Sequence, residues 1–300
     1  MKKHDAFSGL HPAVSFLYFG MAICFSILLM HPLCLLCSLT GAFCYTLRLK
    51  GGRGMAKNLR VLAPMLILTA LINPAFSHAG VTILGYFPTG NPLTLESVLY
   101  GLAAAAMLGA VFGWFACFNA VMTADKFVYL FGRILPALSL LLSMTLRFVP
   151  RFAAQARAIA QAQRGMEPKK CRSLAQRMQT GVRILSALVT WSMESAVETA
   201  DSMRSRGYGL PGRTAFALYR FDRRDGAALA GMLICGGMTA AGKIGGALRW
   251  NWYPAVSGDP WSAGQGIALT AYLLLCLLPV LLDAQADAAW KREGRLCRVR

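Results

Sequence analysis

The sequence predicts an all-α integral membrane protein with about six transmembrane helices, and its composition carries that prediction. Hydrophobic residues make up 56% of the 300 residues, well above the share in an ordinary soluble domain. The formal net charge is nevertheless +18, because 31 Lys and Arg stand against 13 Asp and Glu. A soluble nucleic-acid-binding protein would also be basic, but it would lack the long uncharged apolar runs found here. The composition therefore favours a membrane protein over a partner of nucleic acid.

Six apolar segments are candidates for membrane spans. The first two lie within residues 12–47, which hold no Lys, Arg, Asp or Glu and are divided by His31 and Pro32. The other four are residues 61–76, 97–123, 227–242 and 266–282. A span needs roughly 17 to 25 apolar residues, so the fourth segment is long enough and the others are marginal. No small-residue cleavage site follows the first run, and we expect it to stay in the membrane.

The basic residues predict the orientation in the membrane. If the N-terminus is cytoplasmic, the stretch 48–60, the segment 125–225 and the tail 291–300 all lie inside. Of the 31 basic residues, only Lys243 and Arg249 then lie outside, in agreement with the positive-inside rule. We therefore expect a multi-pass protein of the cell membrane with both termini cytoplasmic. Its parts would be membrane helices in 1–124, a cytoplasmic region in 125–225, and two further membrane helices with a basic tail in 226–300.

The first part of the cytoplasmic region predicts a long amphipathic helix. Apolar residues recur there at spacings of four, four and three, which is a helical pattern: Phe148, Phe152, Ala156 and Ile159. Gly165, with Pro168 just beyond, is a stop signal and predicts the end of this helix.

A second long helix is predicted from about Arg172 to Arg206. One stripe along its last turns is apolar: Val189, Met193, Ala196, Val197, Ala200 and Met203. Such a helix would be roughly 50 Å long, and Gly181 is a candidate for a break or a bend. Gly207 and the glycines and proline that follow it predict the end of the helix.

The two predicted helices end alike, in Gln163-Arg164-Gly165 and in Ser205-Arg206-Gly207. Two ordinary glycine caps, each with an arginine that favours the helix dipole, would explain either end alone. Their repetition on two cytoplasmic helices favours a paired docking device. A guanidinium fork at a helix tip suits a carboxylate in a partner's groove, and a glycine beside it removes side-chain bulk.

Longer stretches of the chain carry a resemblance to a known family. They are LHPAVSFLYF, HPLCLLC, NPLTLESVLYGLAAAAMLGAVFGWFACFNAVMTADKFVYLF, LSLLLSMTLRFVPRFAAQARAIAQAQRGM and SALVTWSMESAVETADSMRSRGYGLPGRTAFALYRF. Over about residues 11–225 the chain resembles the transmembrane T component of energy-coupling factor (ECF) importers of vitamins and metal ions. This family includes the cobalt-transport Q protein.

The resemblance implies a non-catalytic subunit of an ATP-driven importer. Two coupling helices would insert their tips into grooves of two cytoplasmic ATPase subunits, and the membrane part would hold a separate substrate-binding S component. Arg164 with Gly165 and Arg206 with Gly207 match these tips. The family often has Ala before the arginine, so Gln163 and Ser205 change the fit of the tip and leave the arginine in place. In this family the S component sets the transported solute.

Other chemical motifs in the chain are weak. The run 237–243 has the glycine and lysine spacing of a P-loop, but Ile244 replaces the Ser or Thr and the run lies in an apolar segment. Close helix packing is the favoured interpretation. Cys34 and Cys37 have CxxC spacing with no nearby His or second Cys pair, which also favours packing. The four histidines form no metal-binding pattern, so we expect no cofactor and no bound catalytic metal.

Two other classes of function are kept as alternatives. A membrane enzyme could hold a phosphate-bearing lipid on the basic cytoplasmic region, with the grouped acids Glu194, Glu198 and Asp201, whose spacing is typical of a solvated helix face. A stand-alone permease would need ionisable residues within its spans, which are almost absent. One further group suits anionic lipid headgroups or a subunit contact: Tyr208, Arg213, Arg220, Arg223 and Arg224. The aromatic outer loop 247–264 receives no role from its sequence.

Overall fold

The computed structural model describes residues 6–77, 80–86, 92–132, 136–166, 174–208, 210, 219–258 and 260–296, and only the backbone for 136–140 and 291–296. These residues form two compact units. One lies within Met1–Thr123 and Tyr219–Arg300, and the other lies within Ala124–Leu218.

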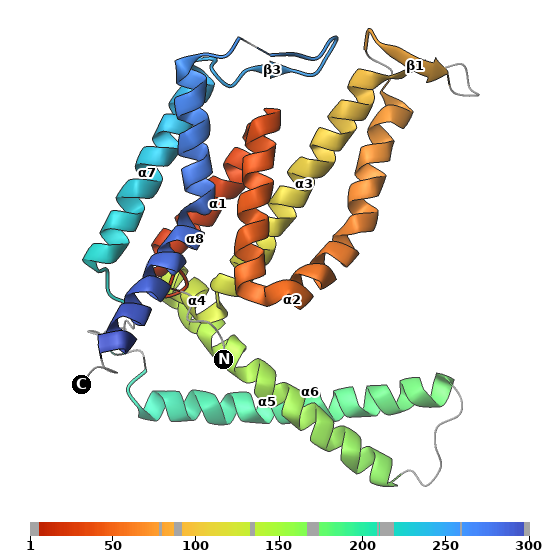
Figure 1. The fold of residues 1–300 in the computed structure, drawn as a ribbon. Helices are drawn as coiled ribbons and strands as arrows, with labels where there is room; N and C mark the ends of the chain where they lie inside the picture. Colours follow the sequence, from red (N-terminus) through yellow and green to blue (C-terminus); the bar gives the residue numbers. More distant parts are fainter. Residues whose placement is uncertain are drawn as a thin grey trace. The chain divides into compact units, whose positions relative to one another are not determined.

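The first unit is a helical bundle built from the predicted apolar segments (Figure 1). Its helices are α1 (Pro12–Leu28), α2 (Pro32–Phe76), α3 (Leu95–Val121), α7 (Arg223–Ile244) and α8 (Ala263–Leu296). By length and composition, α2, α3, α7 and α8 could each cross a membrane, and α1 is a shorter apolar helix of 17 residues. These four candidate spans agree with the integral membrane protein that the sequence predicts.

Helix α2 contains the second and third predicted spans and bends between them (Figure 1). The bend is at Gly51, whose φ of 69° lies in the left-handed region that glycine adopts without steric cost. The basic stretch between the two spans is therefore largely helical, and it surrounds the bend. At the other end of the helix, Pro32 occupies the first turn, where its missing N–H leaves no intrahelical bond unmade.

Aromatic rings fill the core of the bundle. Phe7 packs edge-on against Tyr18 and Tyr45, with ring centroids 5.2 and 5.9 Å apart, and Phe19 packs edge-on against Trp114 at 6.4 Å. Polar atoms of these rings are satisfied inside the bundle. The Trp114 indole N–H donates to the Ser38 hydroxyl at 3.0 Å, and the Tyr18 hydroxyl donates to the Leu275 carbonyl at 3.0 Å. Such bonds matter most where no water can replace them.

A buried carboxylate ties the N-terminal segment to α2 and α8. Asp283, only 1% exposed, accepts a hydrogen bond from the Phe7 backbone N–H at 3.0 Å and pairs with Arg48 Nε at 3.5 Å. Arg48 also bonds the carboxylate of Asp287, one turn further along α8. Nothing in the sequence indicates this network, because its members are about 240 residues apart in the chain.

Two short antiparallel hairpins are the exception to the all-α prediction. Strands β1 (Ile83–Tyr86) and β2 (Pro92–Thr94) pair between α2 and α3, and β3 (Trp250–Asn251) and β4 (Ser257–Gly258) pair between α7 and α8. Chains leaving one helix and entering the next run antiparallel, and extended residues between them satisfy their backbone groups by pairing.

The aromatic loop of the second hairpin holds three helix ends together. The Trp252 indole N–H donates to the Met30 carbonyl at 3.0 Å, and the Tyr253 ring lies against Tyr100 with centroids 5.3 Å apart. The Tyr253 hydroxyl also accepts a hydrogen bond from Ser77 at 3.3 Å. The structure thus gives the loop 247–264 a structural role: it joins the α1–α2 turn to the end of α2 and the start of α3.

His31 lies buried beneath this loop and caps α2. Its Nδ1 accepts a hydrogen bond from the Leu33 backbone N–H at 3.3 Å, its Nε2 faces the Gln265 amide at 3.1 Å, and its ring packs edge-on against Trp250. Burial lowers the pKa of His31 because it penalises the charged imidazolium. The neutral ring is the form that can accept at Nδ1.

The second unit consists of α4 (Ala124–Gly132), α5 (Pro136–Met166) and α6 (Leu174–Ser205). Helix α5 begins before the amphipathic stretch and continues through Gly165 to Met166, so the prediction that Gly165 ends it is wrong by one residue. Helix α6 ends at Ser205 and runs unbroken through Gly181, so the candidate break there is not made. A single glycine costs a helix only about 1 kcal/mol, which a 32-residue helix tolerates.

Candidate docking site on the crossed helices

Helices α5 and α6 cross, and α5 packs on α6 through the apolar face that the sequence predicts for α5. The stripe predicted for α6 is mostly exposed instead, and α6 contributes Trp191 to the contact. Phe152 and Trp191 meet at the crossing, with ring centroids 5.6 Å apart and planes nearly perpendicular. The Arg151 guanidinium lies 5.4 Å from the Trp191 ring centroid, and Phe148 packs beside Phe152 at 6.1 Å. An aromatic pair and a cation–π contact each stabilise a fold by about 0.5–1.5 kcal/mol beyond burial. These contacts therefore fix where the two helices cross, and we call them the Phe152–Trp191 joint.

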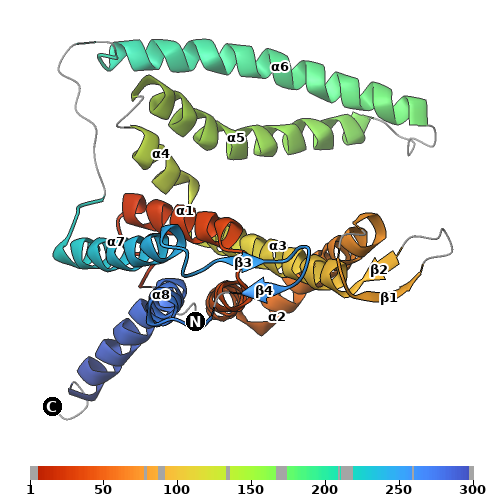
Figure 2. The ribbon, with the colours of Figure 1, turned by 90° about the horizontal axis from the view of Figure 1, so that it is seen from above.

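The carboxyl ends of the two helices lie at opposite ends of the crossed pair, as both views show (Figures 1 and 2). From Phe152 to Arg164 is about 18 Å along α5, and from Trp191 to Arg206 about 22 Å along α6, at 1.5 Å per residue. The structure therefore does not bring the two predicted tips together. It holds them apart by up to about 40 Å, a separation suited to two different contacts.

The first tip is a regular helical turn. Gln163 is half-buried, whereas Arg164 and Gly165 are exposed. Gly165 is helical, and a Cβ added to it would meet nothing within 4 Å. Neither its backbone nor the described residues around it require glycine, although glycine weakens a helix by about 0.5–1 kcal/mol relative to alanine. The residue type at position 165 is therefore unexplained by the fold.

The second tip is a glycine-capped helix end. Gly207 has a φ of 81°, its N–H donates to the Arg204 carbonyl at 3.0 Å, and the Tyr208 N–H donates to the Met203 carbonyl at 3.0 Å. These two bonds form a Schellman motif, which satisfies carbonyls that the helix leaves free. At this tip the glycine cap of the simpler interpretation is confirmed. The motif also fixes the direction in which Arg206 leaves the helix.

Both arginines face solvent. Within the residues that the structure describes, neither Arg164 nor Arg206 forms an ion pair with an acidic side chain. The Ser205 hydroxyl, next to Arg206, donates back to the Ser202 carbonyl at 2.9 Å and so is engaged within its helix. Each tip thus presents one exposed guanidinium, which can bind a carboxylate through two parallel N–H bonds.

Helix α6 has a second face that stays exposed among the described residues of its unit. A continuous apolar stripe at helical spacing is 46–78% exposed there: Leu174, Met178, Val182, Leu185, Val189, Met193 and Val197. The sequence predicts the later part of this stripe, and the structure extends it towards the start of the helix. Exposed apolar surface of this length is typical of a protein or membrane contact.

The remaining predicted residues fall outside a common site. Glu194, Glu198 and Asp201 are exposed along α6, as expected of a solvated face. Tyr208, Arg220, Arg223 and Arg224 are exposed as well, and Arg213 lies outside the described residues. Among the described residues no group of three or more His, Cys, Asp or Glu could hold a metal ion.

The P-loop-like run and the CxxC pair lie inside helices. Residues 237–243 belong to α7, and a Cβ on Gly242 would lie 2.5 Å from the Ala268 Cβ of α8, so this glycine permits close helix packing. Cys34 and Cys37 belong to the first turns of α2, where Cys34 is buried and Cys37 half-buried, both as free thiols. The packing interpretation is confirmed for Gly242, whereas a Cβ on Gly237 would meet nothing within 4 Å.

Comparison with known families decides the relationship. The profile of the CbiQ family, described as cobalt transport protein, matches residues 5–216. The chain belongs to the CbiQ family. The match includes the α5 and α6 tips and ends before α7, so α7 and α8 lie beyond the matched residues.

Two curated relatives are energy-coupling factor transporter transmembrane proteins named EcfT. The protein from Lacticaseibacillus paracasei is 38% identical over 104 residues, which cover 34% of this chain and 39% of the relative. The protein from Bacillus selenitireducens is 36% identical over 100 residues, covering 32% of this chain and 37% of the relative. The matched segments thus span about two fifths of the length of these relatives.

Proposed function

We propose that the chain is the T component of an ECF importer, a non-catalytic membrane subunit that carries motion from two cytoplasmic ATPases to a substrate-binding S component. The importer would take up a vitamin or a metal ion. One observation supports this most strongly: a member of the CbiQ family presents two exposed arginines at opposite ends of a crossed helix pair.

The two tips suit two ATPase subunits rather than one. Arg164 and Arg206 each sit on a rigid helix end, and the Phe152–Trp191 joint sets the angle between the helices. A pull on one tip is therefore passed along its helix to the joint. Each arginine would enter a groove lined by a carboxylate, and Gly165 or Gly207 would let the partner's wall approach the helix.

The exposed apolar stripe of α6 would contact the S component. Its residues carry no charge, and its length suits a membrane protein lying against the helix. When the Arg206 tip moves with its ATPase, the stripe moves with it, because both belong to α6. Contact between the stripe and the S component is the step that would tilt the latter.

The proposed arrangement in the membrane uses six spans. They are α1, the two halves of α2 on either side of Gly51, α3, α7 and α8, with residues 125–225 and both termini in the cytoplasm. The basic residues around Gly51 then lie at the inner surface, as the positive-inside rule favours.

Affinity capture of the tagged chain from its native host tests the docking proposal. Wild type should capture ATPase subunits together with a small hydrophobic membrane protein, and Arg164→Glu/Arg206→Glu should capture neither ATPase. The matched control is Arg157→Glu/Arg177→Glu, which makes the same charge change at exposed positions on the same two helices away from the tips. Full capture by the tip variant, or equal loss in the control, would contradict the proposal.

The stripe has its own test. Met193→Glu and Val197→Glu change exposed side chains, so the fold should be kept while the small membrane partner is lost and the ATPases are retained. Retention of the membrane partner by both variants would place its contact elsewhere.

A further inference from the structure

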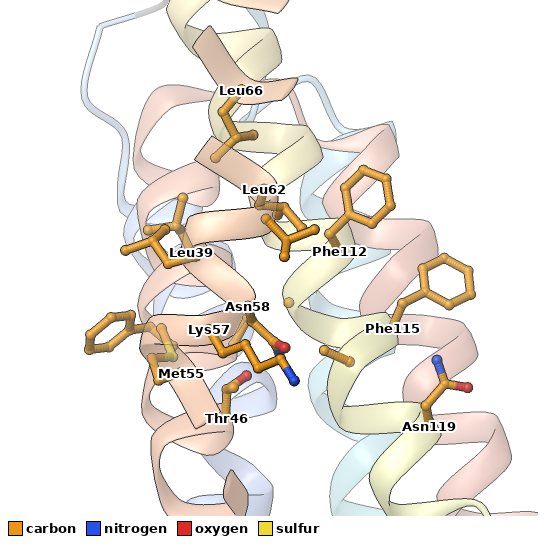
Figure 3. Close-up of a pocket in the computed structure, with 17 residues that line it drawn as sticks. Leu39, Thr46, Met55, Lys57, Asn58, Leu62, Leu66, Phe112, Phe115 and Asn119 are labelled. Carbon is orange, nitrogen blue, oxygen red and sulfur yellow. The ribbon is translucent and has the colours of Figure 1, made fainter. Parts of the chain in front are cut away.

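A cavity lies in the bend of α2, between its two halves and α3 (Figure 3). Its volume is about 380 Å³, within the range of about 300–1,000 Å³ of small-molecule sites. All its lining residues come from α2 and α3, and the bend at Gly51 keeps the two halves of α2 apart. The proposed ATPase and S-component contacts do not use this cavity.

Most of the cavity wall is apolar. Leu39, Leu62, Leu66 and Phe112 lie towards one end, from both halves of α2 and from α3 (Figure 3). Gly109 adds no side chain to the wall, and a Cβ there would be in ordinary contact with Leu66 and Leu39 at 3.6–3.8 Å. A wall of this kind offers water few hydrogen bonds and suits a hydrocarbon chain.

The opposite end of the cavity is polar and basic. Lys57, Asn58, Thr46 and Asn119 lie there (Figure 3). The buried Thr46 hydroxyl is engaged with the Cys117 thiol at 3.1 Å, so the ammonium of Lys57 and the amides of the two asparagines are the groups left for a ligand. Lys57 is exposed and has no acidic partner in the described part of the chain.

The chain segment at this end is basic, although its Arg48 is already paired with Asp283 and Asp287 of α8. Residues 48–60 include Arg48, Lys50, Arg53, Lys57 and Arg60 and no acidic residue. Basic pockets between membrane helices bind anionic lipid headgroups, and an ammonium with amide N–H donors suits a phosphodiester. A neutral ligand would gain nothing from this end, and a free anion would gain nothing from the apolar wall.

We propose that the cavity binds one anionic phospholipid, with an acyl chain along Leu39, Leu62 and Phe112 and the phosphate at Lys57, Asn58 and Asn119. With both termini in the cytoplasm, as proposed above, this end lies at the cytoplasmic leaflet, which carries anionic lipids. Because the lipid touches both halves of α2, it stabilises the bend. The site goes beyond the coupling function and depends only on α2 and α3.

Native mass spectrometry of the delipidated full chain in detergent tests the site, with phosphatidylglycerol and phosphatidylcholine of the same acyl chains as probes. Wild type should bind one phosphatidylglycerol at least about fivefold more tightly than phosphatidylcholine, and Lys57→Gln should abolish that preference. Arg60→Gln, three residues away and outside the cavity lining, should stay within about twofold of wild type.

Two further arms distinguish a lipid site from a diffuse basic surface and from a site for a free anion. Gly109→Leu fills the apolar end and should weaken both lipids about tenfold or more, while a water-soluble glycerol phosphate at the same concentration should displace neither. Equal weakening by Lys57→Gln and Arg60→Gln would mean a diffuse surface charge and would overturn the site. Unchanged lipid binding by Gly109→Leu, or displacement by glycerol phosphate, would overturn it as well. No ATPase is present in this experiment, so its outcome is independent of the coupling proposal.

Discussion

Gly165 offers a sharp test of why the first tip carries a glycine. Gly165→Ala puts a methyl group where the structure has open space and a helical backbone. The isolated helix end should become more stable, by up to about 1 kcal/mol. Hydrogen exchange of the last turn of α5 should slow by up to about fivefold, since about 1.4 kcal/mol corresponds to a factor of ten.

The same Gly165→Ala change should weaken binding of the ATPase to this tip, although it stabilises the helix end. If a partner's groove closes on the helix at position 165, one added methyl group overpacks the contact and costs about 1–3 kcal/mol. That corresponds to about 5- to 150-fold weaker binding of this tip. The second tip would mask the loss through avidity, so the assay uses the Arg206→Glu background and measures ATPase binding to the purified chain by light interferometry.

Gly207→Ala is the matched comparison. Alanine at a φ of 81° costs about 1–2 kcal/mol, and its Cβ would lie 3.1 Å from the Leu210 side chain, so the helix end itself should loosen. Gly165→Ala should therefore separate stability from docking, whereas Gly207→Ala should lower both. Unchanged ATPase binding by Gly165→Ala in the Arg206→Glu background would refute the close approach at position 165.

Three further predictions concern the helical bundle, each measured by thermal unfolding of the purified chain in detergent. Arg48→Met should destabilise the bundle by about 3 kcal/mol, because it leaves the buried Asp283 carboxylate without its cation. The double variant Arg48→Met/Asp283→Leu should be milder, and equal losses would contradict the pairing. Gly41→Ala should lower the free energy of unfolding by about 1–3 kcal/mol, because its Cβ would lie 2.7 Å from the Cys276 Cβ. Gly20→Ala is the control, because a Cβ there would meet no atom within 4 Å and should be tolerated. The stability of the fold should decrease as the pH drops below about 6.5. The pKa of His31 is lowered in the folded chain, so the unfolded chain binds the proton more readily at low pH. His31→Asn keeps a helix cap and should flatten this pH dependence.

The sequence predicts most of the helices because their signals are local. Uncharged runs mark the apolar helices, and the spacing of Phe148, Phe152, Ala156 and Ile159 marks the face of α5 that packs on α6, where all four are half-buried. The exposed arginine tips are also predicted locally, from the Arg-Gly pair at each helix end. These features depend on neighbours within a few turns, which a single sequence displays.

Other features depend on residues far apart in the chain and could not be read from it. The pairing of Arg48 with Asp283 and the bridge from Trp252 to Met30 join segments more than 200 residues apart. The bend at Gly51 also escaped prediction, because a glycine in a basic stretch does not reveal a positive φ. Gly165 and Gly207 look equivalent in sequence, yet only Gly207 forms a left-handed cap.

If each tip holds its own ATPase subunit, the number of ATPases in the complex depends on how many tips are intact. Native mass spectrometry of the chain captured with its ATPases would be compared for wild type, Arg164→Glu, Arg206→Glu and the double variant. We expect two ATPases on wild type, one on each single variant and none on the double variant. Two ATPases on both single variants, or the loss of both from either one, would contradict independent docking at the two helix ends.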